Sequence, residues 1–226
     1  MPHLPQLLAS HRRILVLDAA STNIAVGLLR PDESAIWAQS SDDAGRWVFQ
    51  GTERVLAQAG LGLDAVDAFL FCAGPGSMLG TRTIAMALRT WLVLQARPVY
   101  AYQSLAVAGR AEWVRRPRAF TLIADARRET WHTQGVAADG TLVPLRRLGA
   151  AELPAGELLT PAEFRAWSAR PGGVAECEYD LAAIFARLGT ADLFTAEPSP
   201  DAFQHEAPDY KKWSAQTHSA ETAPKR

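Results

Sequence analysis

The sequence predicts an α/β protein in which a mixed sheet is covered by helices and followed by a smaller unit of the same kind. Three observations carry this prediction: short apolar runs between polar turns near the N-terminus, a change to helical periodicity after residue 44, and a return of the opening pattern near residue 118. With 226 residues, the chain is long enough for one or two small domains with a sizeable core.

The first unit opens with three predicted strands in succession. Apolar runs at residues 13–18 and 24–29 are separated by Ser21, Thr22 and Asn23, which favour a hairpin turn. Pro31-Asp32 then turns the chain into a third run at residues 35–38. We expect these strands to pair antiparallel.

Helices and strands alternate in the rest of this unit. Apolar residues at helical spacing predict a helix over residues 44–59, and a strand follows at residues 65–73. A second helix, apolar nearly all round, is predicted over residues 81–95, and a strand over residues 98–102. A short helix then begins at Ser104, its expected cap, and runs through Ala111. The order β-β-β-α-β-α-β is typical of ribonuclease-H-like halves.

The second unit begins in the same way and is shorter. Strands are predicted at residues 120–125 and 130–136, with a turn at Asp139-Gly140. The capping-box pattern Thr160-Pro161-Ala162-Glu163 predicts the start of a helix, and another helix is predicted over residues 180–188, closed by Gly189. We divide the chain into an extension (1–12), a first half (13–108), a reduced second half (109–196) and an extended tail (197–226), disordered after Trp213.

Composition and charge exclude several classes of protein. The formal net charge of −1 argues against a surface built around nucleic-acid phosphates. Cys72 and Cys177 form neither a disulfide framework nor a zinc pattern. No apolar run reaches the roughly 18 residues of a membrane span, and residues 1–13 lack the features of a signal peptide. We therefore expect a cytoplasmic protein that does not contact a membrane.

The most informative segment is Gly74-Pro75-Gly76-Ser77-Met78-Leu79-Gly80, between a predicted strand and a predicted helix. Its glycines let the backbone come close to an anion or to another backbone, or they serve only a tight connection. The spacing does not match the dinucleotide fingerprint, and no Gly-Lys-Ser/Thr ending makes it a phosphate-binding P-loop.

Catalytic and metal-binding patterns are weak. A Ser77, His132 and Asp125 set stays open as a hydrolase site, although the nucleophile elbow requires glycine where Pro75 and Leu79 stand. No metal site is expected, because the chain has neither a His-x-x-x-His pair nor a dense acidic cluster.

Two groups of charged residues remain. Asp18 ends the first strand, where actin-like phosphotransferases carry an acid, but Ala19-Ala20 replaces the expected glycine, so we favour a structural turn acid. The pairs Arg115-Arg116, Arg127-Arg128 and Arg146-Arg147 are interpreted as solvated edges or as a modest phosphate patch without interleaved aromatics.

Several segments, at recognisable spacing, together resemble the TsaB (YeaZ) family. They are Ile14-Leu15-Val16-Leu17-Asp18-Ala19-Ala20-Ser21, Ala73-Gly74-Pro75-Gly76-Ser77 through Gly80 and Arg82, Pro98-Val99-Tyr100, Ser104-Leu105, Ile123-Ala124-Asp125-Ala126-Arg127, and the more distant Glu206-Ala207-Pro208-Asp209-Tyr210-Lys211. The chain departs from the family at Met78-Leu79, and it lacks the first-helix histidine at Gly45-Arg46-Trp47.

The resemblance implies an actin-like (ASKHA) fold of two ribonuclease-H-like halves, the second reduced. It also implies a non-catalytic subunit in the synthesis of threonylcarbamoyladenosine at position 37 of tRNA. Such a subunit pairs with a TsaD-type transferase, is joined by a TsaE-type ATPase, meets tRNA indirectly, and forms a homodimer when isolated. No tightly bound cofactor and no catalytic residue are expected. The only nucleotide site that the resemblance allows, for ATP or ADP, is at the partner interface.

The resemblance also suggests site residues. The helices at residues 44–59 and 81–95 form the transferase-facing surface in the family. The expected interface residues are Trp47, Gly76, Ser77, Gly80, Arg82, Arg89 and Trp91, with Trp47 expected to be exposed. The candidate cofactor contacts are Asp18, Gly74, Gly76 and Ser77.

The alternative is an enzyme on the same fold, either an actin-like kinase or a hydrolase that uses Ser77. Micromolar binding of ATP and magnesium to the isolated chain would favour the kinase.

Overall fold

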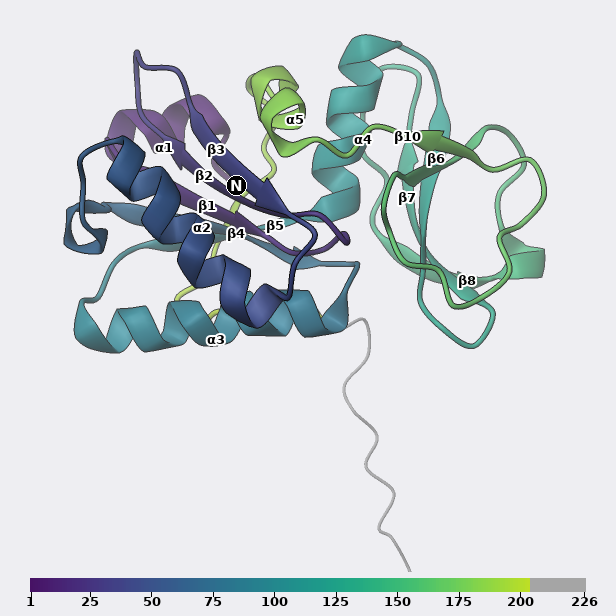
Figure 1. The fold of residues 1–226 in the computed structure, drawn as a ribbon. Helices are drawn as coiled ribbons and strands as arrows, with labels where there is room; N and C mark the ends of the chain where they lie inside the picture. The colour runs from purple at the N-terminus through teal and green to yellow at the C-terminus, as the bar shows by residue number, and fades with distance from the viewer. Residues whose placement is uncertain (204–226) are drawn as a thin grey trace, which may run out of the picture.

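The computed structural model describes residues 1–203, which form two sheets side by side with helices packed between and around them (Figure 1). The C-terminal segment that resembles the TsaB family, residues 206–211, and most of the predicted tail lie outside the described residues.

The first sheet has six strands in the order β11-β5-β4-β1-β2-β3. The strands are β1 (Ile14–Asp18), β2 (Ile24–Leu29), β3 (Ile36–Ser40), β4 (Ala68–Gly74), β5 (Val99–Gln103) and β11 (Thr195–Ala196). Strands β1, β2 and β3 pair antiparallel, whereas β4 lies parallel to both β1 and β5. The predicted succession of three antiparallel strands is confirmed.

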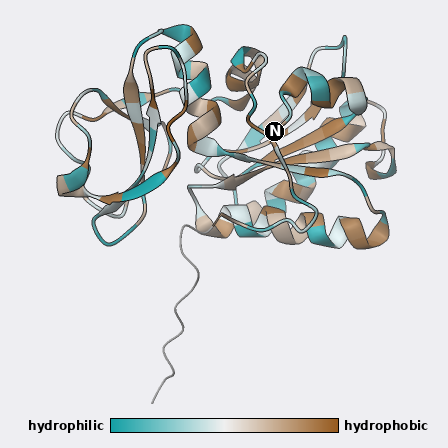
Figure 2. Cartoon of the chain, turned by 180° about the vertical axis from the view of Figure 1, so that it is seen from behind, coloured by the Kyte–Doolittle hydropathy of each residue, from teal (hydrophilic) through white to brown (hydrophobic). Residues whose placement is uncertain are grey.

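Helices cover both faces of this sheet. Helices α2 (Ala44–Gln58) and α3 (Met78–Leu94) lie on one face, and α1 (Leu4–Ser10), α4 (Ser104–Arg115) and α5 (Leu181–Arg187) lie on the other (Figure 1). Successive side chains of a strand point to opposite faces of the sheet, so β1 contributes to both layers. Leu15 and Leu17 belong to the core beneath α2 and α3, whereas Ile14 and Val16 belong to the opposite core. Accordingly, the strands of this sheet are mostly apolar in Figure 2.

The second sheet repeats the topology of the first. Its order is β10-β9-β6-β7-β8, and the strands are β6 (Phe120–Asp125), β7 (Thr130–Val136), β8 (Arg146–Gly149), β9 (Leu158–Pro161) and β10 (Ala175–Cys177). Strands β6, β7 and β8 pair antiparallel, and β6, β9 and β10 pair parallel, as β1 to β5 do in the first sheet. Only the short 3₁₀ helix η2 (Ala150–Glu152) stands where α2 stands in the first half. The prediction of two ribonuclease-H-like halves with a reduced second half is confirmed.

Some predicted element boundaries are wrong. Residues Thr160 and Pro161 belong to β9 rather than to a helix, because this segment pairs with β6 and β10. Ser104 does not cap α4, which runs to Arg115; its hydroxyl instead donates a hydrogen bond to the carbonyl oxygen of Pro75. Tertiary contacts override the local capping pattern at both places.

The ends of the two halves interlock more than the predicted division suggests. Leu4 and Leu7 of α1 are buried, so the predicted extension 1–12 contributes to the core. Strand β11 and helix α5, which we assigned to the second half, pack on the first sheet: Thr195 pairs with Ala101, and the Phe185 ring lies against Tyr102.

Candidate functional site

The glycine-rich turn approaches another backbone segment. The Ser77 N–H donates a hydrogen bond of 2.7 Å to the Ala20 carbonyl oxygen in the β1–β2 turn. A Cβ added to Gly76 would collide with that oxygen, and a Cβ added to Gly80 would collide with the Ala19 carbonyl oxygen. The two glycines therefore allow the start of α3 to lie directly on the first hairpin.

Ser77 itself has a structural role in this position. Its side-chain oxygen accepts a hydrogen bond of 3.3 Å from the Gly80 N–H and caps α3, which begins at Met78 rather than at Thr81. This contact, together with the Ser104 hydroxyl on Pro75, holds the entry to α3.

Asp18 is completely buried, and its carboxylate accepts hydrogen bonds from one N–H group and two hydroxyls. One oxygen accepts from the Ala20 N–H at 2.8 Å, and the other accepts from the hydroxyls of Tyr102 at 2.7 Å and Tyr179 at 2.9 Å. Burial raises the pKa of Asp18, although the hydrogen bonds from Tyr102, Ala20 and Tyr179 act in the opposite direction. These contacts leave little room for the magnesium and phosphate that the equivalent acid of a phosphotransferase would hold.

Asp125 occupies the equivalent place at the end of β6, but it is only half-buried. Its carboxylate accepts hydrogen bonds from the N–H groups of Arg127, Trp167 and Ser168. Partial burial would raise its pKa, but these backbone donors lower the pKa below the usual value. Asp125 therefore ties the loop around Trp167 to the β6–β7 hairpin.

A cleft of about 330 Å³ lies between the start of α3 and this hairpin, and Ser77, His132 and Asp125 all line it. In the β6–β7 register, however, Asp125 is opposite Trp131 and His132 is opposite Ala124. Directly opposed residues share a sheet face and successive residues alternate, so Asp125 and His132 point to opposite faces. The three residues meet in one cleft, but the register does not favour a Ser-His-Asp relay.

Two of the predicted interface residues, both tryptophans, are buried. The expected exposure of Trp47 is wrong, because the side chain is only 9% exposed and packs beside Gly51, whose missing Cβ leaves room for the indole. Trp91 is likewise buried, its ring 5.6 Å from that of Phe69. Both side chains stabilise the packing of α2 and α3 rather than offering a surface.

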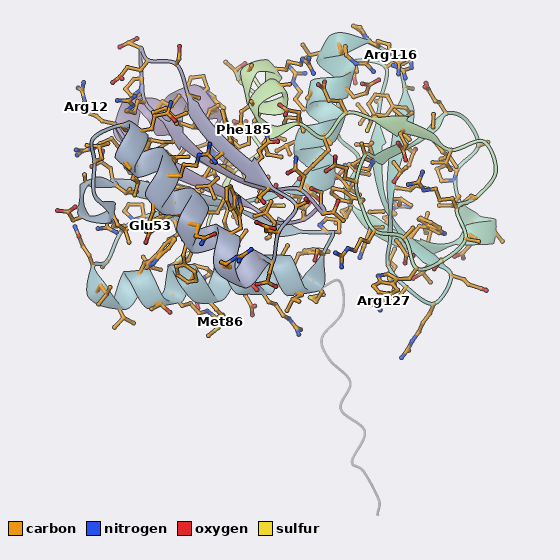
Figure 3. All side chains as sticks on the ribbon, viewed as in Figure 1. Arg12, Glu53, Met86, Arg116, Arg127 and Phe185 are labelled. Atoms are coloured by element: carbon orange, nitrogen blue, oxygen red, sulfur yellow. The ribbon has the colours of Figure 1, made fainter. Side chains whose placement is uncertain are left out.

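The outer face of α3 and the adjoining part of α2 carry the exposed apolar surface that the helix periodicity predicts. We call this set the α3 face; its residues are Phe49, Met78, Leu79, Met86, Val93 and Leu94. Figure 3 shows Met86 on the side of α3 that points away from the sheet. The sequence pattern places Met86 and Val93 opposite the buried stripe of this helix, which is apolar nearly all round, but none of the six residues is among the predicted interface residues.

The other predicted interface and cofactor residues differ in their exposure. Arg82 and Arg89 are exposed on α3, and Arg89 lies 3.6 Å from the carboxylate of Asp201. Gly76 is exposed and Ser77 half-buried, whereas Gly80 and Gly74 are buried at the turn. Arg82 and Arg89 stand four residues before and three residues after Met86, so they share the exposed side of α3 with it.

Within residues 1–203, no helix is long and apolar enough to cross a membrane. In the same range, no group of three or more His, Cys, Asp or Glu side chains is arranged to hold a metal ion.

Comparison with known proteins places the fold. No protein-family model matches the sequence, and no curated protein matches it. Among solved structures, YeaZ from Pseudomonas aeruginosa superposes with a TM-score of 0.61 at 21% identity, covering 78% of this chain and 89% of that one. A second structure, of an uncharacterized Pseudomonas aeruginosa protein with similarity to peptidase YeaZ, gives a TM-score of 0.60 at 20% identity with the same coverage. The chain therefore has the fold of YeaZ, with the two ribonuclease-H-like halves that the sequence predicts.

Proposed function

We propose that this chain is a TsaB-type, non-catalytic subunit in the synthesis of threonylcarbamoyladenosine at position 37 of tRNA, and that it pairs with a TsaD-type transferase through the α3 face. The observation that carries the proposal is the α3 face itself, which stands on a fold shared with YeaZ. Two of the motifs that resemble the TsaB family, at residues 14–21 and 73–82, form the first hairpin and the turn that begins α3.

The composition of the α3 face supports protein binding. Large apolar side chains exposed on one side of a helix mark interaction sites, because leaving them in water is unfavourable. Exposed Arg82 and Arg89 stand on the same side of α3 as Met86 and would supply polar contacts to a partner. A groove of about 400 Å³ beside Phe49 and Leu63 would accept a side chain of the partner.

The environment of Asp18 supports a non-catalytic role for this chain. Its carboxylate is sealed by Tyr102 and Tyr179, and the glycine-rich turn is occupied by the first hairpin. The same proposal includes a TsaE-type ATPase as a further partner, a cytoplasmic location, and a homodimer through the α3 face when the transferase is missing.

Co-purification with a TsaD-type transferase tests the interface. Replacing Met86 and Val93 by Asp places charge in the centre of the α3 face, and we expect recovery of the complex to fall at least about tenfold, since burying an unpaired charge is costly. Val114→Asp, an exposed apolar residue on α4, is the matched control and should leave recovery unchanged. Equal recovery from all variants would remove the α3 face from the proposal.

Depletion of the protein tests the pathway. We expect mass analysis of tRNA nucleosides to show loss of threonylcarbamoyladenosine, restored by the wild-type chain but not by the Met86→Asp, Val93→Asp double variant. Calorimetric titration with ATP and magnesium separates this role from the kinase alternative, which requires micromolar affinity in the isolated chain.

A further inference from the structure

An exposed tryptophan and an arginine are held together beside the cleft. Trp167 is 67% exposed, and the Arg127 guanidinium lies 4.7 Å from its ring centroid. Asp125 accepts hydrogen bonds from the backbone N–H groups of both residues, so the loop and the hairpin that carry them are fixed relative to one another. Figure 3 shows Arg127 at the side of the second half that is nearest to α3.

The hairpin that presents Arg127 has an unusual backbone. Arg127, Arg128 and Glu129 have φ angles of 66°, 52° and 59°, a left-handed conformation that non-glycine residues rarely adopt in succession. Arg147 supports this turn from β8, since its guanidinium donates hydrogen bonds to the Thr130 hydroxyl at 2.8 Å and to the Ala126 carbonyl at 3.1 Å. Backbone in such regions persists only where the surroundings enforce it, and it is concentrated at functional sites.

The charges around the cleft favour an anion. Arg127 and Arg165 line it, while the carboxylate of Asp125 is already bound by three backbone N–H groups. Arg128 lies on the same hairpin as Arg127 and Arg146 lies on β8; both are exposed, and neither forms an ion pair within residues 1–203. The structure thus interleaves arginine with an aromatic side chain, which the linear sequence does not show.

A planar ring attached to phosphate fits this arrangement. Bases stack on exposed aromatic side chains and on guanidinium groups, and arginine also binds phosphate. Because Trp167, Arg127 and Arg165 are exposed rather than enclosed, a free nucleotide would remain largely in solvent, whereas a strand would carry further phosphates to Arg128 and Arg146.

We propose that this cleft binds an unpaired nucleotide of single-stranded RNA, with its base on Trp167 and its phosphates on Arg127 and Arg165. The proposal rests on the proposed function in tRNA modification, and it replaces the indirect contact with tRNA by a direct one.

Fluorescence anisotropy of a labelled short single-stranded RNA, with the full chain at about 50 mM salt, tests this proposal. We expect Trp167→Ala to weaken binding about tenfold and Trp167→Phe to weaken it much less, because stacking supplies that much affinity per base. Arg127→Ala should weaken binding and reduce the slope of log affinity against log salt by about 0.7. Arg54→Ala, an exposed arginine on α2 without an ion pair in the described chain, removes the same charge and should change neither quantity.

Three results would overturn the proposal: no RNA binding by the wild-type chain, equal binding by Trp167→Ala, or displacement of the RNA by AMP at the same concentration as by unlabelled RNA. Capture of the transferase by the Trp167→Ala variant separates the two proposals. Lost RNA binding with intact capture supports both, whereas failure of the wild-type chain to capture the transferase removes the proposed function alone.

Discussion

Two aspartates at equivalent chain positions have opposite electrostatic environments. Asp18 ends β1 and Asp125 ends β6, and each accepts a hydrogen bond from the N–H two residues ahead. Burial dominates at Asp18 and raises its pKa, whereas backbone donors outweigh burial at Asp125 and lower its pKa. The same hairpin position therefore holds the two halves together through Tyr179 in one case and organises a surface loop in the other.

The raised pKa of Asp18 predicts a pH dependence of stability. The folded state binds the Asp18 proton more tightly than the unfolded chain does. The stabilising contribution of the protonated carboxyl group is therefore fully present below the ordinary pKa of about 3.9 and is lost as the pH rises through the folded pKa. We expect the free energy of unfolding of Asp18→Asn, relative to wild type, to increase as the pH rises from about 4. Urea unfolding at a series of pH values measures this, and a difference that stays constant over the series would contradict it.

Asp125→Asn should show the reverse dependence. The lowered pKa of Asp125 means that its stabilising contribution is present above the ordinary pKa and is lost as the pH falls through the folded value. We expect this variant to be less stable than wild type at neutral pH and to approach it in acid, as measured by the same unfolding series. A variant that matches wild type at neutral pH would show that the backbone donors do not need the charge.

Adding a side chain at Gly80 should destabilise the contact between the start of α3 and the first hairpin. A Cβ at this position collides with the Ala19 carbonyl oxygen, so Gly80→Ala should lower the free energy of unfolding by about 2 kcal/mol. Gly172→Ala is the matched control, because a Cβ there meets no atom within 4 Å and its φ is not in the left-handed region. Thermal unfolding of the two variants makes the comparison, and equal midpoints would mean that the hairpin and α3 separate without cost.

At the scale of elements, α2 and α3 each bury one face and expose the other. On α2, Trp47 and Phe49 stand two residues apart, which places them on different sides of the helix. Trp47 packs into the core beside Gly51, whereas Phe49 is 43% exposed, with its ring 5.9 Å from that of Trp91. Stability and partner binding are therefore carried by neighbouring positions of one helix.

This pair predicts separable effects of two substitutions. Trp47→Ala should lower the free energy of unfolding by about 3–5 kcal/mol, the usual cost of deleting a buried aromatic side chain. Phe49→Ala should cost less than about 1 kcal/mol, since much of its surface is already in water, yet it should reduce capture of the transferase. Denaturant unfolding and co-purification of both variants test the assignment, which fails if Phe49→Ala proves the more destabilising.

Across the whole molecule, the chain leaves the first sheet, builds the second, and returns. Phe185 of α5 lies 5.5 Å from the Trp37 ring and 5.7 Å from the Tyr102 ring, both in the first sheet. One core cluster contains Ile14 of β1, Leu122 of β6 and Phe185 together. The two halves therefore share a core, and we expect them to unfold together.

Phe185→Ala tests this shared core. We expect the loss of about 3–5 kcal/mol in one cooperative transition, seen at the same denaturant concentration by tryptophan fluorescence and by far-UV circular dichroism. Leu94→Ala, at an exposed position of α3, should leave the transition in place. Two separate transitions in the Phe185→Ala variant would show that the halves are energetically independent.

Features that depend on neighbouring residues can be recognised from the amino-acid order alone. The pattern of apolar side chains placed strands β1 to β7 and helices α2 and α3, and α5 lies within the helix predicted over residues 180–188. These patterns involve residues only a few positions apart, so they can be recognised without knowing the contacts of the rest of the chain. Strands β8 to β11 were not predicted.

Features that depend on residues far apart in the chain are visible only in the folded protein. Asp18 is sealed by Tyr102 and Tyr179, which stand 84 and 161 positions away, and the glycine-rich turn meets the carbonyl groups of the first hairpin. Pairing with β6 and β10 made a strand of the Thr160 segment, and folding brought Trp167 onto Arg127. The physical reason is the same in each case: burial, pairing and stacking are settled by contacts that form only when the sheets assemble.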